Sequence, residues 1–320
     1  GKSTLLLLLN CLVRPVSGRI TYRQKAIDSR DAMLDYRRKV SMVFQEPLLF
    51  DTTVYKNVAS GLKIRSMKKD EIRERVTRYL KCFNIEHLAH RSARKLSGGE
   101  AQRASLARAF AIEPDIIFLD EPFSALDPPT RNALTEDLDR ILRQTGITAL
   151  MVTHDQSAAL RMSDRIVVMN NGSIVQQGTP LDVMNNPSNE FVASFVGMDT
   201  ILEGKVVKSS EGSITVSVSG KEIDAVGNSK EGEKVYCCIR PENVSIELIN
   251  PDDLSSARNV FAAEIRDISS LGPFLKLTLD CGFPLVSYVT REAFTRLDLE
   301  EGKKVFSVFK ATAVHVIPGK

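Results

Sequence analysis

The chain has 320 residues, of which 43% are hydrophobic and 26% are charged, and its formal net charge at pH 7 is +3. This composition predicts a globular protein with room for two domains, and a charge so close to neutral gives no indication of a nucleic-acid partner. The longest apolar run, Leu5 to Leu9, is too short to span a bilayer, and we expect no signal peptide at the start.

The cysteines are odd in number, scattered, and without the spacing of a metal site. We therefore expect reduced core residues of a cytosolic protein rather than a disulfide framework. They are Cys11, Cys82, Cys237, Cys238 and Cys281.

The first residues, Gly1-Lys2-Ser3-Thr4, match the end of the phosphate-loop pattern GxxxxGK[ST]. In that pattern backbone N–H groups cradle phosphates, the lysine reaches the terminal phosphates and the hydroxyl ligates Mg²⁺. The start of the pattern precedes Gly1, so we expect a fragment of a longer protein. We expect this fragment to bind nucleotide more weakly than a version extended upstream.

Strand and helix patterns follow in order. Residues 18–28 alternate as in a strand, and residues 40–44 form a buried-type strand that ends at Gln45. Residues 54–90 are helical in pattern, and their charged run is expected to be a solvated helix face. Both histidines of this region are expected at the surface: His87 and His90.

A glycine turn opens the next helix, which extends from Ser97 to about Ala111. Ser97 is a good N-cap, and Glu100 has the spacing of a capping box. Gly98 and Gly99 let backbone N–H groups converge at the positive end of the helix dipole. This turn therefore predicts an anion site, most simply for phosphate.

Two acids follow a continuous apolar strand, residues 116–119, as Asp120-Glu121 before Pro122. In open α/β sheets, ligands bind beyond the carboxyl ends of the strands, where these acids would project. A solvated loop start is the alternative reading of the pair. The glycine turn in the same stretch favours a functional site.

Further along, residues 129–144 predict an amphipathic helix, and residues 147–153 predict another parallel strand that ends at His154. A hairpin (164–180) and a helix (186–197) follow. From about Ile201 the pattern changes to short alternating strands. The segment 231–240 is echoed by 301–310, which predicts two similar OB-like units.

The order LSGGE, IIFLDEP and SALD within residues 96–127 resembles the signature, Walker B and D-loop of ABC transporter ATPase subunits. The resemblance implies an α/β fold: a P-loop NTPase cassette with a parallel sheet and a helical subdomain at about 51–110. It places the cassette at 1–199 and a small all-β domain with two OB-like repeats, of the TOBE/Mop-like kind, at 200–320.

The resemblance also implies ATP and Mg²⁺ as cofactors. It gives catalytic roles to Glu121 as general base, to His154 at the γ-phosphate and to Gln45 near the attacking water. Mg²⁺ is expected at Ser3 and Gln45, with Asp120 acting through water. The full set of expected nucleotide contacts is Gly1, Lys2, Ser3, Thr4, Gln45, Asp120, His154, Ser97, Gly98, Gly99, Glu100, Gln102 and Asp127.

The expected partners are a second ATPase subunit, transmembrane permease subunits and, indirectly, an extracytoplasmic solute-binding protein. In the family the glycine turn serves the nucleotide of the second subunit. We expect a peripheral protein on the cytoplasmic face of the inner membrane and no nucleic-acid partner. A soluble ABC ATPase of DNA repair or translation is the other class, but its coiled-coil insertion and second cassette are not in this sequence.

The cargo is indicated only by the C-terminal part. Its segments 255–261 and 309–317 resemble those of molybdate-binding domains attached to molybdate and tungstate importers. Hydroxyl and cationic side chains there would suit a tetrahedral dianion, with a solvated turn and a barrel strand as the alternative. Importers of sulfate, polyamines, iron or sugars remain open. The candidate oxyanion ligands are Ser255, Ser256, Arg258 and Lys310.

Overall fold

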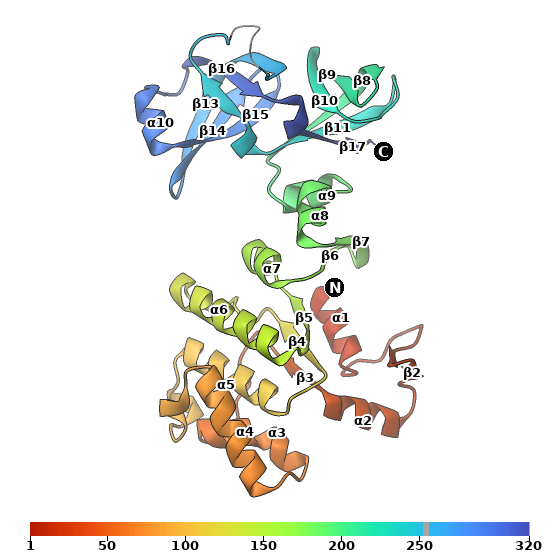
Figure 1. Cartoon of the computed structure of the whole chain (residues 1–320), viewed down its shortest axis with the longest axis vertical. Coiled ribbons are helices and arrows are strands. Elements are labelled where there is room, and N and C mark those ends of the chain that lie inside the picture. The colour runs from red at the N-terminus through yellow and green to blue at the C-terminus, as the bar shows by residue number, and fades with distance from the viewer. Residues whose placement is uncertain (252–255, 320) are drawn as a thin grey trace. The chain divides into compact units, whose positions relative to one another are not determined.

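The structure is a computed structural model that describes residues 1–251 and 256–319. Contacts divide the chain into two compact units, residues 1–162 and 163–320 (Figure 1). Residues 163–199, which the sequence assigned to the cassette, lie in the second unit. Hydrogen bonds from Arg240 and His315 hold this segment to the β-strands of that unit. This division by contacts does not test the predicted boundary between the cassette and the all-β domain at 199/200, which stays a prediction.

A parallel three-stranded sheet forms the centre of the first unit, in the order β3 (Val40–Val43), β4 (Ile116–Asp120) and β5 (Thr148–Val152). The middle strand β4 is buried at Ile117, Phe118 and Leu119, as a continuous apolar run in a parallel sheet requires. The predicted parallel strands are therefore confirmed.

Strand β5 differs from β4 in its burial. Its first three residues are exposed, Leu150 to 37%. Among the strands that the structure describes, β5 is hydrogen-bonded to β4 alone. An edge strand with one neighbour keeps its apolar side chains partly in water, and its sequence does not reveal which edge it occupies.

Two layers of helix cover the sheet. On one side α1 (Lys2–Leu9) and α2 (Arg30–Lys39) bury Leu6 and Tyr36 against Phe118. The larger core contains α5 (Gly98–Ala111) and α6 (Pro128–Thr145), with α3 (Val54–Ile64) and α4 (Lys69–Cys82) packed on α5 (Figure 1). Small side chains of α5 are fully buried and allow close packing: Ala104, Ala107 and Ala111.

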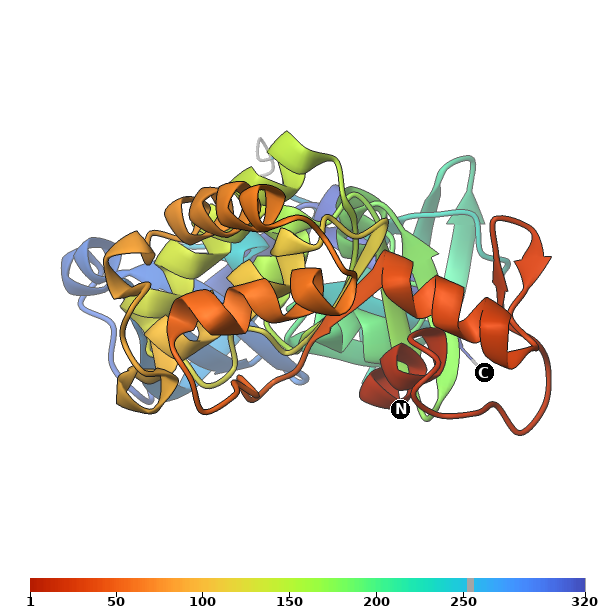
Figure 2. The same ribbon diagram turned by 90° about the horizontal axis from the view of Figure 1, so that it is seen from below.

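The prediction of one strand at 18–28 is wrong. The segment forms a hairpin of two short strands, β1 (Thr21–Tyr22) and β2 (Lys25–Ala26). The turn residues Arg23 and Gln24 have φ values of 47° and 65°. Positive φ at both central positions is the two-residue turn of a hairpin, without the glycine or asparagine that usually announces it. Figure 2 shows this hairpin extending beyond α2, away from the other helices.

The second unit begins with the hairpin β6 (Ile166–Asn170) and β7 (Ser173–Gly178) and two short helices, α8 (Pro180–Asn185) and α9 (Glu190–Phe195). Arg240 donates to the carbonyls of Val196 at 2.8 Å and Met184 at 2.6 Å. A ring nitrogen of His315 lies 3.1 Å from the carbonyl of Pro187. Both side chains therefore hold this segment against the β-strands.

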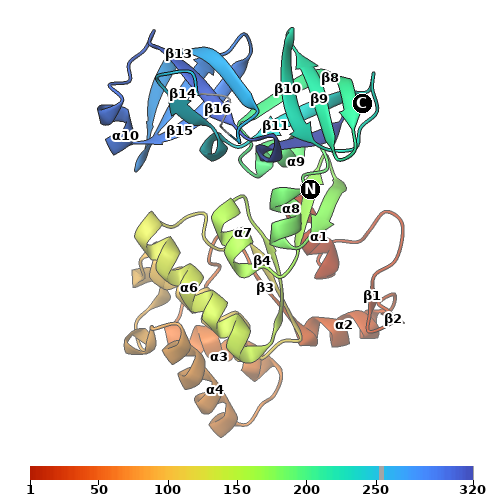
Figure 3. The same ribbon diagram turned by 45° about the horizontal axis from the view of Figure 1, so that its top comes forward.

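Two five-stranded antiparallel sheets make up the rest of the second unit (Figure 3), with orders β10-β9-β8-β11-β17 and β12-β16-β13-β14-β15. They share one hydrophobic core. The strands are β8 (Thr200–Ser210), β9 (Ser213–Val218), β10 (Lys221–Val226), β11 (Lys234–Ile239), β12 (Ser245–Glu247), β13 (Asn259–Leu271), β14 (Phe274–Asp280), β15 (Pro284–Thr290), β16 (Lys304–Phe309) and β17 (Val314–Pro318). The helix α10 (Arg291–Arg296) follows β15.

The two predicted repeats are present, and they exchange their last strands. The repeated segments form β11 and β16, each followed by a 3₁₀ turn and a short strand. The strand after β11, β12, pairs with β16, and the strand after β16, β17, pairs with β11. Each sheet is thus completed by the other repeat, which explains the single shared core.

No helix among the described residues is long and apolar enough to cross a membrane. The cysteines carry free thiols, as predicted, and all except Cys82 are buried. Burial raises the pKa of Cys237 and of Cys238 to about 12, so both thiols stay protonated and unreactive at neutral pH.

Candidate nucleotide site

The carboxyl edge of the parallel sheet collects polar groups from three separate segments. Asp120 ends β4 and Glu121 follows it, while Thr153 and His154 follow β5. Helix α1 begins at Lys2 and contacts both strands. Because the strands are parallel, their carboxyl ends meet at one edge, where the sequence placed the site.

Two contacts join the start of α1 to this edge. The Ser3 hydroxyl donates to Oδ1 of Asp120 at 2.9 Å, and Nζ of Lys2 donates to the carbonyl of Thr153 at 3.3 Å. Lys2 and Ser3 are exposed and Asp120 is half-buried. A cation, a hydroxyl and a carboxylate therefore lie together and open to solvent.

Glu121 and His154 form a pair beside them. Nδ1 of His154 lies 2.9 Å from Oε2 of Glu121, and the His154 backbone N–H donates to the same oxygen at 3.4 Å. The Glu121 side chain is 15% exposed and that of His154 is 71% exposed. The carboxylate is thus held inside while the imidazole faces solvent.

Glu121 has a left-handed backbone, with φ of 46°. Its N–H donates to the carbonyl of Val152 at 2.9 Å, which continues the pairing of β4 with β5 by one residue. A left-handed glutamate costs free energy, and such strain concentrates at functional sites. The geometry turns the carboxylate towards the end of β5 instead of along β4.

Gln45 lies two residues beyond β3, at the same edge of the sheet, and is exposed. No hydrogen bond or ion pair joins it to another described residue. The sheet therefore brings Gln45 to the correct edge. Its predicted contact with Mg²⁺ and the attacking water stays a prediction.

The glycine turn has the local structure that the sequence predicts. Ser97 caps α5, and a capping box with Glu100 is complete: Ser97 Oγ accepts from the Glu100 N–H at 3.3 Å, and Glu100 Oε2 accepts from the Ser97 N–H at 2.7 Å. That last hydrogen bond is the main reason why the pKa of Glu100 is lowered. Gly98 is open, since a Cβ there would meet nothing within 4 Å.

Gly99 is required for packing. A Cβ at Gly99 would lie 2.7 Å from Cγ2 of Thr130, in the first turn of α6. Asp127 caps that helix by accepting from the Thr130 N–H at 3.2 Å. Its pKa is lowered first by a hydrogen bond from the Thr130 side chain and then by this backbone N–H. Gln102 is 2% exposed, and its amide nitrogen and oxygen have no hydrogen-bond partner. A nucleotide contact by Gln102 therefore needs a change that exposes it.

The C-terminal candidates lie apart from this site in the sequence. Ser255 falls outside the described residues, and Ser256, Arg258 and Lys310 are exposed. Arg258 lines a pocket of about 320 Å³ together with Ala311, the neighbour of Lys310. The remaining lining residues are Lys208, Ser210, Ser213, Ile214, Thr215, Glu222, Asp224 and Ala225.

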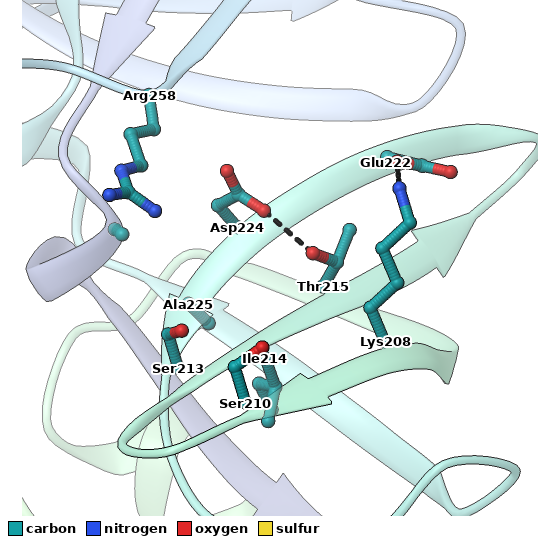
Figure 4. A pocket seen from close by; sticks show the side chains of 10 residues that line it. Lys208, Ser210, Ser213, Ile214, Thr215, Glu222, Asp224, Ala225 and Arg258 are labelled. Atoms are coloured by element: carbon teal, nitrogen blue, oxygen red, sulfur yellow. Dashed lines mark hydrogen bonds and ion pairs between the residues drawn. The ribbon is translucent and has the colours of Figure 1, made fainter.

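This pocket is polar and carries charges of both signs. In Figure 4 Arg258 points towards Asp224, whose carboxylate accepts from Thr215 at 2.8 Å. Lys208 is paired with Glu222 at 3.3 Å. An anion placed in this pocket would meet the carboxylates of Asp224 and Glu222.

Asp155 and Arg131 are two polar residues at this edge that the sequence analysis did not single out. Asp155 accepts from the Ser157 hydroxyl at 2.6 Å and from the Ala158 N–H at 3.1 Å, ahead of α7 (Gln156–Met162). An aspartate directly before a helix is a signal of such a cap. Arg131 gives no comparable signal, because its carboxylate partner Asp155 is 24 residues away in the sequence.

Comparisons with known proteins show the family. The sequence model of the ABC transporter family matches residues 1–124, and that of the TOBE domain matches residues 255–316. A molybdate/tungstate import ATP-binding protein of Pyrococcus horikoshii is 36% identical, over 99% of this chain and 89% of its own length. The protein of the same description from Pyrococcus abyssi is 37% identical, with the same coverage of both chains.

A spermidine/putrescine import ATP-binding protein of Clostridium novyi is 38% identical, over 77% of this chain and 70% of its own length. Among solved structures, cbiO1 from Clostridium perfringens, described as part of the ABC transporter complex cbiONQ, is 36% identical with a TM-score of 0.55. That match covers 58% of this chain and 75% of the other. With its parallel sheet, glycine turn and paired acid and histidine, the chain belongs to the ATP-hydrolysing subunits of the ABC transporter family.

Proposed function

We propose that this protein energises the import of molybdate or tungstate, acting as a homodimer at the cytoplasmic face of the membrane against two permease subunits. The observation that carries the ATPase part is the placement of Glu121 and His154 beside Ser3 and Asp120 at one sheet edge. The cargo is inferred from the two Pyrococcus relatives, which match along nearly the whole chain. The solute-binding protein of such a system would act through the permease.

Lys2, with Gly1 and Thr4 at the start of the same helix, would hold the terminal phosphates of ATP. Ser3 and Asp120 fit Mg²⁺, because a hydroxyl and a carboxylate 2.9 Å apart are hard oxygen donors. The described residues contain no cluster of three or more acidic, histidine or cysteine ligands. That suits an ion held by one or two protein groups plus phosphate oxygens, with Gln45 as an added donor. Bound Mg²⁺ would neutralise charge that develops on the phosphates.

Glu121 is the proposed general base. Its carboxylate is shielded from solvent yet reaches the open edge, and it accepts from the His154 backbone and faces its ring. It would orient a water molecule for in-line attack and take its proton. His154, which faces solvent, would donate to the γ-phosphate and hold it in line.

The glycine turn supplies a second anion site, and one nucleotide needs only one phosphate loop. We assign Ser97, Gly98, Gly99 and Glu100, with Asp127, to the nucleotide of the second subunit. ATP would then hold two copies together, and hydrolysis would release them, which is a two-state switch driven by ligand. The open space at Gly98 supports this, since phosphate must approach the backbone there.

The C-terminal part would sense the cargo through Ser256, Arg258 and Lys310, with Ser255 as a further candidate. A polyamine importer is the second candidate, because the Clostridium novyi relative matches over 77% of the chain and Asp224 and Glu222 line the pocket. Sulfate, iron and sugar remain weaker alternatives. The experiment is ATPase activity in the reconstituted importer with added molybdate, tungstate, sulfate or spermidine. Inhibition by molybdate and tungstate alone supports the oxyanion reading, and an effect of spermidine alone contradicts it.

The ATPase assignment is tested with Glu121→Gln in the full-length protein. We expect ATP affinity within about twofold of wild type, a fall in turnover of about 10²- to 10⁴-fold, and an ATP-trapped dimer on gel filtration. Turnover that stays near the wild-type rate would contradict the general-base role.

A further inference from the structure

One arginine joins the two loops that leave the carboxyl edge of the sheet. Arg131 lies in the first turn of α6, and its Nη2 donates to the carbonyl of Leu126 at 3.0 Å. Its Nη1 lies 3.9 Å from Oδ2 of Asp155, the residue after His154. The loop after β4 and the loop after β5 are therefore linked by one guanidinium.

This link is incompletely made. The Arg131 Nε is buried and has no hydrogen-bond partner, and the ion pair to Asp155 is too long for a hydrogen bond. A guanidinium presents its N–H groups as a rigid fork that fits both oxygens of a carboxylate. A movement of about 1 Å would turn the long ion pair into hydrogen bonds.

Asp155 is held firmly on its own loop. Besides its bonds to Ser157 and Ala158, its N–H donates to Oγ1 of Thr153 at 2.9 Å. The Ser157 hydrogen bond is the main cause of a lowered pKa at Asp155, so the carboxylate is ionised at neutral pH. Any shift of His154 therefore carries a fixed negative charge with it.

The other end of the link reaches the glycine turn. Leu126 immediately precedes Asp127, which caps α6 through the Thr130 N–H. The Thr130 methyl group in turn fills the space that a side chain at Gly99 would need. A displacement of this loop is therefore transmitted by direct contact to the start of α5.

We propose that Arg131 is a positioning residue that couples the placement of His154 to the placement of the glycine turn. When His154 moves onto the γ-phosphate, Asp155 approaches the Arg131 fork, and Arg131 draws the Leu126 loop, with Thr130, to a defined position against Gly99. The inference rests on the proposed ATPase function. In addition, one chain would align both groups that it contributes to nucleotide sites, His154 at its own nucleotide and the glycine turn at that of the second subunit.

The test compares Arg131→Met, Asp155→Asn and the double variant in the full-length protein. We expect each single change to lower kcat about tenfold with KM for ATP within about twofold, because the arrangement for hydrolysis is lost and ground-state binding is kept. The kcat of the double variant should be no lower than that of either single variant, as expected when both residues act through one interaction. Arg131→Lys keeps the charge without the fork and should also lose activity, with an unchanged Tm.

The matched control is Arg161→Met, which removes an exposed ion pair to Glu136 at 3.3 Å, also between the segment after β5 and α6. It should keep wild-type kcat. A wild-type kcat in Arg131→Met, or a double variant slower by the product of both single effects, would overturn the coupling. An inactive wild type would instead contradict the proposed function itself.

Discussion

Two of the arginine–aspartate pairs of helix α6 join it to other segments of the chain, and they are built in opposite ways. Arg103 and Asp137 are 15% and 12% exposed at their side chains, and Nη1 lies 2.5 Å from Oδ2. Asp137 also accepts from Arg140 and Asn84, and Arg103 also donates to the carbonyl of Phe83. This cluster is closely paired and ties α4, α5 and α6 together.

The Arg131–Asp155 pair is longer, at 3.9 Å, and leaves a buried donor without a partner. A network with all its groups paired fixes one arrangement of the helices. In the proposal above, the incompletely paired Arg131 moves closer to Asp155 during the reaction. We therefore expect the middle of α6 to contribute to stability and its first turn to contribute to the reaction. Substitutions should separate the two.

The largest effect on stability is expected for Asp137→Ala. It leaves the Arg103 guanidinium buried without its acceptor, which should lower the free energy of unfolding by about 3 kcal/mol. Urea unfolding followed by circular dichroism measures this. The control Asp139→Ala removes an exposed pair with Arg143 on the same helix and should change stability by less than about 0.5 kcal/mol. Equal losses in both variants would contradict the comparison.

At the carboxyl edge of the sheet, His154→Ala should lower activity and leave stability almost unchanged. Turnover should fall about 10²-fold, since a donor to the γ-phosphate is removed. The Tm should hardly change, because the side chain is 71% exposed. Steady-state ATPase assays and thermal unfolding of the same preparation give both values. A stable variant with wild-type turnover would remove His154 from the mechanism.

Ser97→Ala tests the glycine turn, for which we expect a contribution both to stability and to nucleotide binding. Loss of the N-cap hydrogen bond should lower the free energy of unfolding by about 1 kcal/mol. Ser97→Thr, which keeps the cap, is the matched variant and should retain most of that stability. If Ser97→Ala is as stable as Ser97→Thr, the cap contributes nothing.

An effect of similar size is the pH dependence of stability at Asp155. Its pKa is lowered in the folded protein, mainly by Ser157, so the stabilisation is present above the unfolded pKa of about 3.9 and is lost as pH falls through the folded value. Ser157→Ala should therefore be less stable than wild type at pH 7, by about 1 kcal/mol. The two proteins should converge towards pH 2. A difference in Tm that persists unchanged at low pH would contradict the assignment.

Local signals in the sequence predicted much of this fold. The cap at Ser97, the buried strand before Asp120 and the parallel edge with His154 follow from residue types and spacing alone. The phosphate-loop pattern supplied the role of Lys2, and the family resemblance supplied that of Glu121. The hairpin at Arg23 and Gln24 escaped prediction because it uses positive φ at two residues that rarely adopt it.

The remaining differences concern partners distant in sequence. Two similar repeats, at 231–240 and 301–310, do not tell which sheet the following strand joins, and the exchange of β12 and β17 is decided by packing in the shared core. The Arg131 link likewise joins Arg131 to Asp155, 24 positions later in the chain, and no sequence pattern pairs these two residues. Such contacts depend on the tertiary fold and leave no periodic pattern.

The most direct test of the central claim is a structure of the full-length Glu121→Gln variant bound to ATP and Mg²⁺. We predict the γ-phosphate within hydrogen-bond reach of Lys2 and His154 of one copy, with the Ser97–Gly99 turn of a second copy on its other side. Nucleotide bound instead in the pocket of about 720 Å³ that Arg23, Arg78 and Asp115 line, at the amino ends of β4 and β5, would contradict the account.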